Sequence, residues 1–220
     1  MPYNAGRYPS PLYSDRTDAG KRLGQKLRKL GLENPIVLAI PAGGVPVGKE
    51  VARLLKAPID LFIARKIRFP WTTEAGFGAV AADGTVYLGP YAQSLPPEVV
   101  QRQTRQAQEE VEQRKRTLLQ GRKEPDLLGR VVILVDDGLA AGSTMLVAVQ
   151  AVRKKQPQRI VVAVPTTSGS AVDLIRPHVD ELIALYVHPR HLPFAVASSY
   201  ENWYDLSDEE VRMYLGDSAL

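Results

Sequence analysis

Short apolar runs recur along the chain and are separated by longer mixed stretches. Four of them, at 36–40, 59–63, 131–135 and 160–164, contain at most one polar residue each. Continuous apolar runs of this length are typical of strands that are buried on both faces of a parallel sheet. A further strand is predicted at 182–187.

Most of the intervals between these runs have helical periodicity. The first predicted helix stops at Gly31 and has its apolar residues at Ala19, Leu23, Leu27 and Leu30. Its candidate N-caps are Asp15, Thr17 and Asp18. Further helices are predicted around 47–55, 143–155 and 171–176, and a capping box at Ser207–Glu210 predicts a last one. Strands that alternate with helices indicate an α/β fold with a parallel sheet.

Residues 64–90 break this rhythm. The stretch GAVAADGTVYLG predicts a hairpin that turns at Asp83–Gly84. A mostly polar helix is predicted from Pro97 to Gln120, and its many charges indicate a solvated face. Its thin apolar stripe consists of Val100, Ala107, Val111 and Leu118. We therefore expect one domain over 1–220, with an α/β core at about 15–187, an inserted flexible loop, hairpin and long helix at 64–120, and a C-terminal hood and helix at 188–220.

Composition narrows the class of protein. The chain has 220 residues, no cysteine and a formal net charge of +4. Without cysteine there are no disulfides or thiolate metal sites, and the cytoplasm is the expected location. No apolar run approaches the roughly 20 residues that span a bilayer, and the N-terminus lacks the apolar segment of a secretory signal. The positive charge fits an anionic ligand or simply a soluble surface, and no motif supports nucleic-acid binding.

The segment ILVDDGLAAGSTM, residues 133–145, is the most informative part of the sequence. A buried strand ends at two adjacent carboxylates, Asp136 and Asp137, which repel each other unless cations or hydrogen-bond donors offset the repulsion. The carboxyl ends of parallel strands are where such sheets bind ligands. Carboxylates accept hydrogen bonds, and a vicinal diol such as that of a ribose offers two donors. The pair is therefore a candidate ribose site.

The loop that follows these carboxylates has almost no side chains. Gly138, Ala140, Ala141 and Gly142 leave the backbone N–H groups accessible, and Ser143 and Thr144 add hydroxyls at the start of a helix. A helix N-terminus attracts anions through its unpaired N–H groups and its dipole. Diol acceptors followed by a phosphate cradle predict a pocket for a ribose 5-phosphate. The alternative is that the aspartates cap the helix and the glycines only turn the chain.

This segment resembles the phosphoribosyl-pyrophosphate motif of the type I phosphoribosyltransferases. The resemblance implies that Asp136 and Asp137 hold the ribose hydroxyls. It also implies that the 5-phosphate lies on Ala140, Ala141, Gly142, Ser143 and Thr144. The family usually has Thr in place of Ala141, so one hydroxyl donor is absent and weaker phosphate binding is expected.

Two further segments resemble other parts of that family's site. Residues 41–46, PAGGVP, resemble the pyrophosphate loop, which implies pyrophosphate binding at Ala42, Gly43 and Gly44, although many relatives have Arg or Lys at the position of Ala42. Arg65 and Lys66 resemble the pair that opens a mobile catalytic loop, expected here to continue through 69–78. The alternatives are glycines that only permit a turn and cations that are only solvated.

At the scale of the whole chain, YSDRTDAGKRLGQKL, PAGGVPV, the Arg-Lys pair, EAGFGAVA, VDDGLAAGST and LSDEEV occur in one order. Together they resemble a bacterial group of phosphoribosyltransferases with unassigned acceptors. The resemblance implies Mg²⁺-dependent transfer of the phosphoribosyl group to a nitrogenous acceptor, and a homodimer. Residues 165–169 and 188–194 are candidate acceptor segments. Their histidines, His188 and His191, lack a third ligand at metal-site spacing and are interpreted as surface or loop residues.

Two alternatives to an enzyme stay open. A non-catalytic phosphoribosyl-pyrophosphate-binding regulator is favoured by Ala42 and Ala141, which remove donors, whereas Lys66, Asp136 and Asp137 favour an enzyme. A basic nucleic-acid-binding protein would rest on charge alone, and its binding would be strongly salt-dependent.

Overall fold

The computed structural model of the chain describes residues 11–72, 75–190 and 194–216. Five strands form a parallel sheet in the order β2-β1-β6-β7-β8. These strands are β1 (Pro35–Ala39), β2 (Ile59–Leu61), β6 (Val131–Val135), β7 (Arg159–Ser168) and β8 (Glu181–His188). Each of the four apolar runs contributes a strand, and every residue of the central strand β6 is buried. The prediction of a parallel α/β sheet is confirmed.

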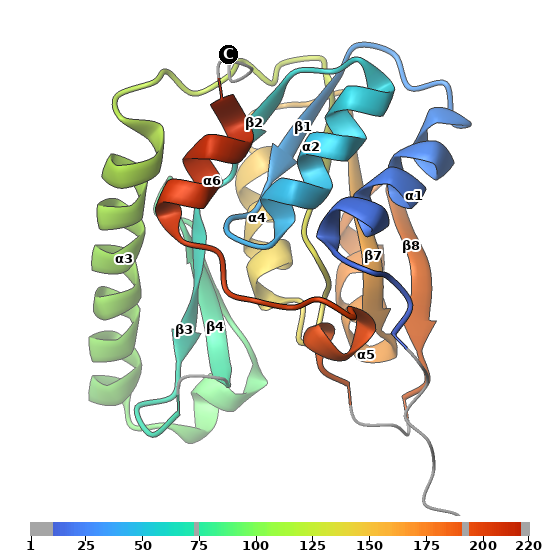
Figure 1. Cartoon of the computed structure of the whole chain (residues 1–220). Coiled ribbons are helices and arrows are strands. Elements are labelled where there is room, and N and C mark those ends of the chain that lie inside the picture. Colours follow the sequence, from blue (N-terminus) through green and yellow to red (C-terminus); the bar gives the residue numbers. More distant parts are fainter. Residues whose placement is uncertain (1–10, 73–74, 191–193, 217–220) are drawn as a thin grey trace, which may run out of the picture.

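Helices cover both faces of this sheet. Because side chains alternate along each strand, Val37 and Ile133 pack under α1 (Arg16–Arg28) and α2 (Gly44–Leu55), whereas Leu38 and Leu134 pack under α4 (Ser143–Arg153) and α5 (Gly169–Ile175). Figure 1 shows α1 and α2 in front of the sheet and α4 behind it. Of the candidate caps of α1, Asp15 is the N-cap, and its side chain accepts a hydrogen bond from the Asp18 N–H. Three short 3₁₀ helices are η1 (Pro90–Ser94), η2 (Arg176–His178) and η3 (Val196–Ser199).

A second sheet stands beside the first. It is an antiparallel ribbon of β3 (Ala64–Arg68), β4 (Gly76–Ala81) and β5 (Val86–Leu88), and the predicted turn at Asp83–Gly84 joins its last two strands. The expectation that a catalytic loop opens at residue 65 is wrong, because residues 64–68 pair with β4 as a strand. The long helix α3 (Pro97–Leu119) packs against the ribbon with its predicted apolar stripe (Figure 1).

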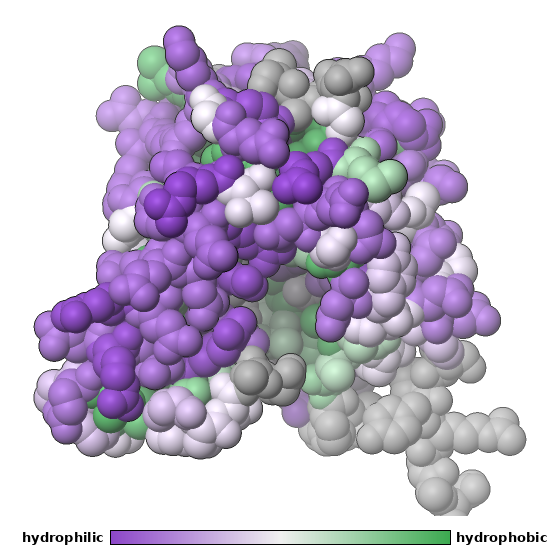
Figure 2. Space-filling model, turned by 60° about the vertical axis from the view of Figure 1, so that its left-hand side comes forward, coloured by the Kyte–Doolittle hydropathy of each residue, from purple (hydrophilic) through white to green (hydrophobic). Residues whose placement is uncertain are grey.

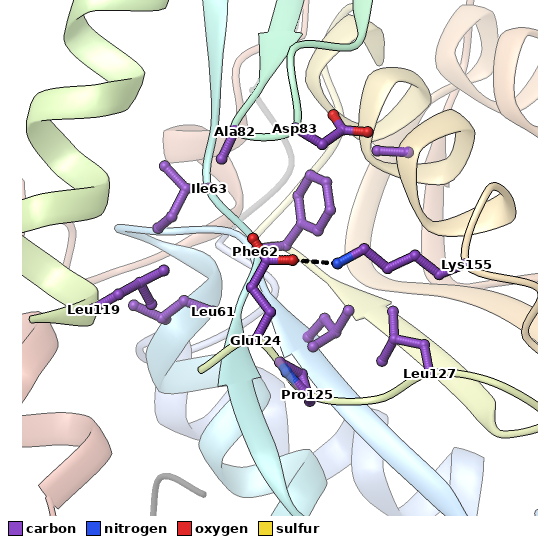
Figure 3. Close-up of a pocket in the computed structure, with 12 residues that line it drawn as sticks. Leu61, Phe62, Ile63, Ala82, Asp83, Leu119, Glu124, Pro125, Leu127 and Lys155 are labelled. Atoms are coloured by element: carbon purple, nitrogen blue, oxygen red, sulfur yellow. Dashed lines mark hydrogen bonds and ion pairs between the residues drawn. The ribbon is translucent and has the colours of Figure 1, made fainter. Parts of the chain in front are cut away.

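A small apolar junction fastens this ribbon to the main sheet (Figure 3). Leu61 and Ile63 meet Leu119 at the end of α3 around a hollow of about 40 Å³. Glu124 and Lys155 form an ion pair at its side. The hollow has little more room than a water molecule or two, so it is a packing junction and not a ligand pocket.

The C-terminal segment crosses the molecule after β8. Tyr200 forms a β-bridge with Tyr13, and the segment then continues to α6 (Asp208–Leu215), which begins with the predicted capping box. Figure 1 shows this segment in red, passing from the side of α1 to the side of α3. None of the helices that the structure describes combines the length and apolar composition needed to cross a bilayer.

The order of the strands places one crevice at the carboxyl edge of the sheet. The chain proceeds from β1 to β2 on one side and from β6 to β7 and β8 on the other, so β1 and β6 lie at the point where the strand order reverses. The two strands pair in register up to Ala39 and Val135. The turn at 41–44 and the segment 136–142 are therefore neighbours, at the position where open α/β sheets bind ligands.

Candidate phosphoribosyl site

The segment that follows β6 forms one wall of a cavity of about 350 Å³. Gly142 has a φ of +81° and is the N-cap of α4, a conformation that a residue with a Cβ adopts only at a cost. The lining comprises Asp136, the loop 138–142, the first turn of α4, Lys66 with the ribbon residues 75–76, and Val196. Figure 2 shows that the molecule is hollowed on one face, with hydrophobic residues in its depth. The structure thus brings the predicted phosphate loop, one aspartate and one lysine to a single cavity.

Asp136 is one of the residues that line this cavity. It is partly exposed, and its Oδ1 accepts a hydrogen bond of 2.8 Å from the Asp137 backbone N–H. Burial and the charge of Asp137 raise the pKa of Asp136 well above its ordinary value. A partly exposed carboxylate can accept further hydrogen bonds from the hydroxyl groups of a ligand. Among the described lining residues, Asp136 and Lys66 are the charged ones.

Asp137 lies beside Asp136 and has a cationic partner of its own. Its Oδ2 accepts a hydrogen bond of 2.8 Å from Arg16 Nε, and both side chains are nearly buried. Its backbone carbonyl accepts a hydrogen bond of 2.6 Å from the Tyr200 hydroxyl. Burial raises the pKa of Asp137, and the Arg16 guanidinium opposes that rise. Asp137 does not line the cavity.

The turn after β1 packs directly against both aspartates. A Cβ at Gly43 would lie 1.8 Å from Asp137 Oδ2, and one at Gly44 would lie 2.9 Å from the Asp136 Cα. Gly43 therefore has no side chain because the Asp137 carboxylate takes its place. Ala42 is partly buried, packs against the core, and follows a cis peptide bond from Pro41. The structure places the predicted pyrophosphate turn beside the aspartate pair.

Strand alternation sends the two predicted catalytic cations to opposite faces of the ribbon. Lys66 lines the cavity, and its side chain covers Gly76 on the neighbouring strand. Arg65 faces α3, with its Nε 3.8 Å from Glu110, which also lies 3.7 Å from Arg68. Burial and the nearby Arg114 lower the pKa of Arg65. The structure brings Lys66 to the phosphate loop but does not bring Arg65 there.

The candidate acceptor segments lie beyond the phosphate loop. His188 ends β8 and is 7% exposed, so its interpretation as a surface or loop residue is wrong. Its Nε2 is 3.3 Å from the Ser199 hydroxyl, which donates a hydrogen bond of 3.1 Å to Thr166. Burial lowers the pKa of His188. His191 lies outside the described residues.

The residues that hold Asp137 were not among the predicted site residues. Arg16 comes from the first turn of α1, and Tyr200 and Tyr204 come from the C-terminal segment. The sequence signals nearest to them are helix caps, which give no information about partners 63 and 121 positions away. Only the spatial arrangement of β6, α1 and the C-terminal segment reveals them.

Comparison with known proteins identifies the class of this fold and site. The phosphoribosyl transferase domain model matches residues 15–188, which include the sheet and both loops. The chain belongs to the phosphoribosyl transferase domain family. The predicted resemblance to phosphoribosyltransferases is confirmed.

Individual relatives agree with this assignment. The crystal structure of TT1426 from Thermus thermophilus is 36% identical, covers 94% of this chain and 99% of its own, and superposes with a TM-score of 0.78. Rv0571c of Mycobacterium tuberculosis, provisionally named a phosphoribosyl transferase, is 35% identical over 210 residues and 93% of this chain. The match covers 46% of Rv0571c, so the chain spans about half the length of this relative. The AQ2163 protein of Aquifex aeolicus, at 14% identity and a TM-score of 0.52, shares the fold.

Proposed function

We propose that the protein transfers the 5-phosphoribosyl group of phosphoribosyl pyrophosphate to a nitrogenous acceptor, a nucleobase or related small molecule, and releases pyrophosphate. The observation that carries this proposal is the shared cavity of Asp136, Lys66 and the loop 138–144. A carboxylate, a cation and a loop of accessible backbone in one cavity support the proposal, because the donor has a diol, a pyrophosphate and a 5-phosphate for them to bind.

The donor's phosphate and ribose would be held by different kinds of group. The 5-phosphate would accept hydrogen bonds from the backbone of Gly138, Ala140, Ala141 and Gly142 and from the hydroxyls of Ser143 and Thr144. The ribose hydroxyls would donate to Asp136, whose side chain faces the cavity. The predicted ribose contact of Asp137 is less favoured, because Arg16 already takes its Oδ2.

The leaving pyrophosphate needs charge stabilisation at the other side of the ribose. The turn of Ala42, Gly43 and Gly44 offers a backbone surface without bulk, and Lys66 supplies a positive charge from the ribbon. Fixed donors and cations aimed at developing charge supply a large part of the acceleration in such transfers. Closure of a loop over the bound donor would exclude water from it.

The donor set fits a magnesium ion of the kind that binds together with its substrate. No three His, Cys, Asp or Glu side chains gather as a metal site within the described ranges. Mg²⁺ typically uses one or two carboxylates together with substrate phosphates, and Asp136 is such a carboxylate. Bound there with the donor, the ion would act as a Lewis acid on the phosphate oxygens.

A second candidate is a binding protein for the same donor that does not catalyse transfer. Ala42 and Ala141 carry no side-chain donors, and Arg65 faces α3, so Lys66 is the one cation among the described lining residues. A regulator needs the ribose and phosphate contacts but not the groups that stabilise the leaving pyrophosphate. For either candidate the homodimer, the cytoplasmic location and the single domain over 1–220 stay predictions.

The decisive experiment measures pyrophosphate release with phosphoribosyl pyrophosphate and Mg²⁺ across purines, pyrimidines and small nitrogenous acceptors. Calorimetry of donor binding accompanies it. Turnover with one acceptor class supports the enzyme, whereas donor binding without any turnover supports the regulator. Absence of donor binding contradicts both. A matched pair of variants tests which of the two cations stabilises the leaving group. We expect Lys66→Ala to lower the rate of pyrophosphate release on the order of a hundredfold and Arg65→Ala to change it little.

A further inference from the structure

Arg16 occupies a position that does not serve its own helix. It is the first residue of α1, next to the N-cap Asp15, and it is 7% exposed. The positive end of the helix dipole disfavours a cation in the first turn, and burial of a guanidinium is costly unless it is fully paired. The reason for this arginine must therefore lie in what it contacts.

Three groups surround the Arg16 guanidinium. Its Nε donates to Asp137 Oδ2 at 2.8 Å, and its Nη1 donates to the Tyr204 carbonyl at 2.8 Å. The ring of Trp203 stacks on the guanidinium, 3.9 Å from its central carbon. A planar guanidinium can use its edge for a carboxylate and its face for an aromatic ring at the same time, which lysine cannot. The C-terminal segment thus fixes the direction from which Arg16 approaches Asp137.

Asp137 is constrained from its other sides as well. The Tyr200 hydroxyl holds its backbone carbonyl at 2.6 Å. Burial and the charge of Asp137 raise the pKa of Tyr200, so its hydroxyl keeps the proton that it donates. The carboxylate in turn fills the space where a side chain at Gly43 would lie. A carboxylate that turned away from Arg16 would move into this turn or leave a gap behind it.

We propose that Arg16 is a positioning residue for pyrophosphate binding. Held by Trp203 and the Tyr204 carbonyl, it fixes the Asp137 carboxylate against Gly43 and so shapes the turn 41–44. This inference rests on the proposed function of that turn. It divides the aspartate pair: Asp136 contacts the ribose, and Asp137 acts through the turn on the pyrophosphate half of the donor.

The test separates the two halves of the donor. Binding of inorganic pyrophosphate and of ribose 5-phosphate, each with Mg²⁺, is measured by calorimetry for the full chain and for Arg16→Lys and Arg16→Met. We expect pyrophosphate affinity to fall on the order of tenfold to a hundredfold. Ribose 5-phosphate affinity should fall by a clearly smaller factor, since Asp136 and the loop 138–144 keep their own side chains and do not contact Arg16 directly. Arg53→Met, which removes an exposed arginine paired with Glu50 on α2, is the matched control.

Other results would contradict either the positioning role of Arg16 or the proposed function. If folded Arg16→Lys binds pyrophosphate as well as the unchanged protein does, or loses both ligands equally, the positioning role is overturned and a general structural role remains. If Arg16→Met does not fold, Trp203→Leu keeps the ion pair but removes the stacked ring, and it should weaken pyrophosphate selectively by a smaller factor. If the unchanged protein binds neither ligand, the proposed function fails, and this inference fails with it.

Discussion

Asp136 and Asp137 are adjacent in the chain and both pack against the turn at Gly43–Gly44, but they have different further partners. Asp136 lines the cavity together with Lys66 and the predicted phosphate loop, and its pKa is raised there. Asp137 lies in a closed junction with Arg16, behind the turn at Gly43. In the proposed function, two identical side chains thus serve binding in one case and architecture in the other.

The largest expected effect is the loss of donor affinity when Asp136, which lines the cavity, is changed. Asp136→Asn should weaken donor binding by about a hundredfold or more, because two charge-assisted hydrogen bonds from the ribose lose the ionised acceptor. Calorimetry with phosphoribosyl pyrophosphate measures the loss. Asp180→Asn, which changes an exposed aspartate paired with Arg153, is the control. Donor affinity that survives in Asp136→Asn would remove Asp136 from the ribose site.

The next effect concerns stability on the junction side. Asp137→Asn should lower the free energy of unfolding by about 3 kcal/mol, because it leaves the Arg16 charge buried without a counter-charge. The asparagine oxygen still accepts a hydrogen bond, which keeps the loss at the lower end of the range for broken buried pairs. Urea denaturation measures the change, and the double variant with Arg16→Met should recover part of it. A loss no larger than that of Asp180→Asn would show that the junction contributes little.

A third prediction contrasts the two aspartates through pH. The pKa of Asp136 is raised in the folded state, so the stability tied to its protonation is fully present below the ordinary carboxyl pKa of about 3.9. That stability is lost as the pH rises through the higher folded pKa. Asp136→Asn cannot ionise, so its melting temperature should exceed that of the unchanged protein increasingly as the pH rises from 4 toward 8. Parallel melting curves across this range would contradict the raised pKa.

The smallest expected effect concerns phosphate affinity at the loop that lines the cavity. Ala141→Thr adds a hydroxyl at an exposed position of the phosphate loop. One further hydrogen bond of about 0.5–1.5 kcal/mol should tighten ribose 5-phosphate binding by roughly twofold to tenfold. Ala141→Val, similar in shape but without the hydroxyl, is the control for calorimetry. Equal affinities of the two variants would mean that the phosphate does not lie at this position.

Local patterns were sufficient to predict most of the fold. The strand β6, the small-residue loop and the start of α4 follow from an apolar run, two carboxylates and a bare segment within 15 positions. The hairpin at Asp83–Gly84 and the capping box at Ser207 are equally local signals and were confirmed. The strand β3 was missed because its sequence, ARKIR, holds three cations, and only pairing with β4 stabilises it as a strand.

The candidate site was less predictable than the fold. The motif identified Asp136, Asp137 and the phosphate loop, but no spacing rule tells which of two adjacent carboxylates faces a cavity. Likewise, the Arg65–Lys66 pair reads as one cationic cluster until strand alternation separates the two side chains. Arg16 and its aromatic partners come from opposite ends of the chain, and their contact is a property of the assembled sheet.

The contact between Arg16 and Tyr204 also has a consequence for the order of synthesis. A chain emerging from the ribosome has released Arg16, the turn at Gly43 and the phosphate loop long before residues 200–204, which enclose the guanidinium. During that interval the charges of Arg16 and Asp137 remain open to water, even if the sheet has already formed. Residues 200–204 thus close a junction whose other parts were made before them, and a nascent chain completes the surroundings of the turn at Gly43 only after these residues have been released.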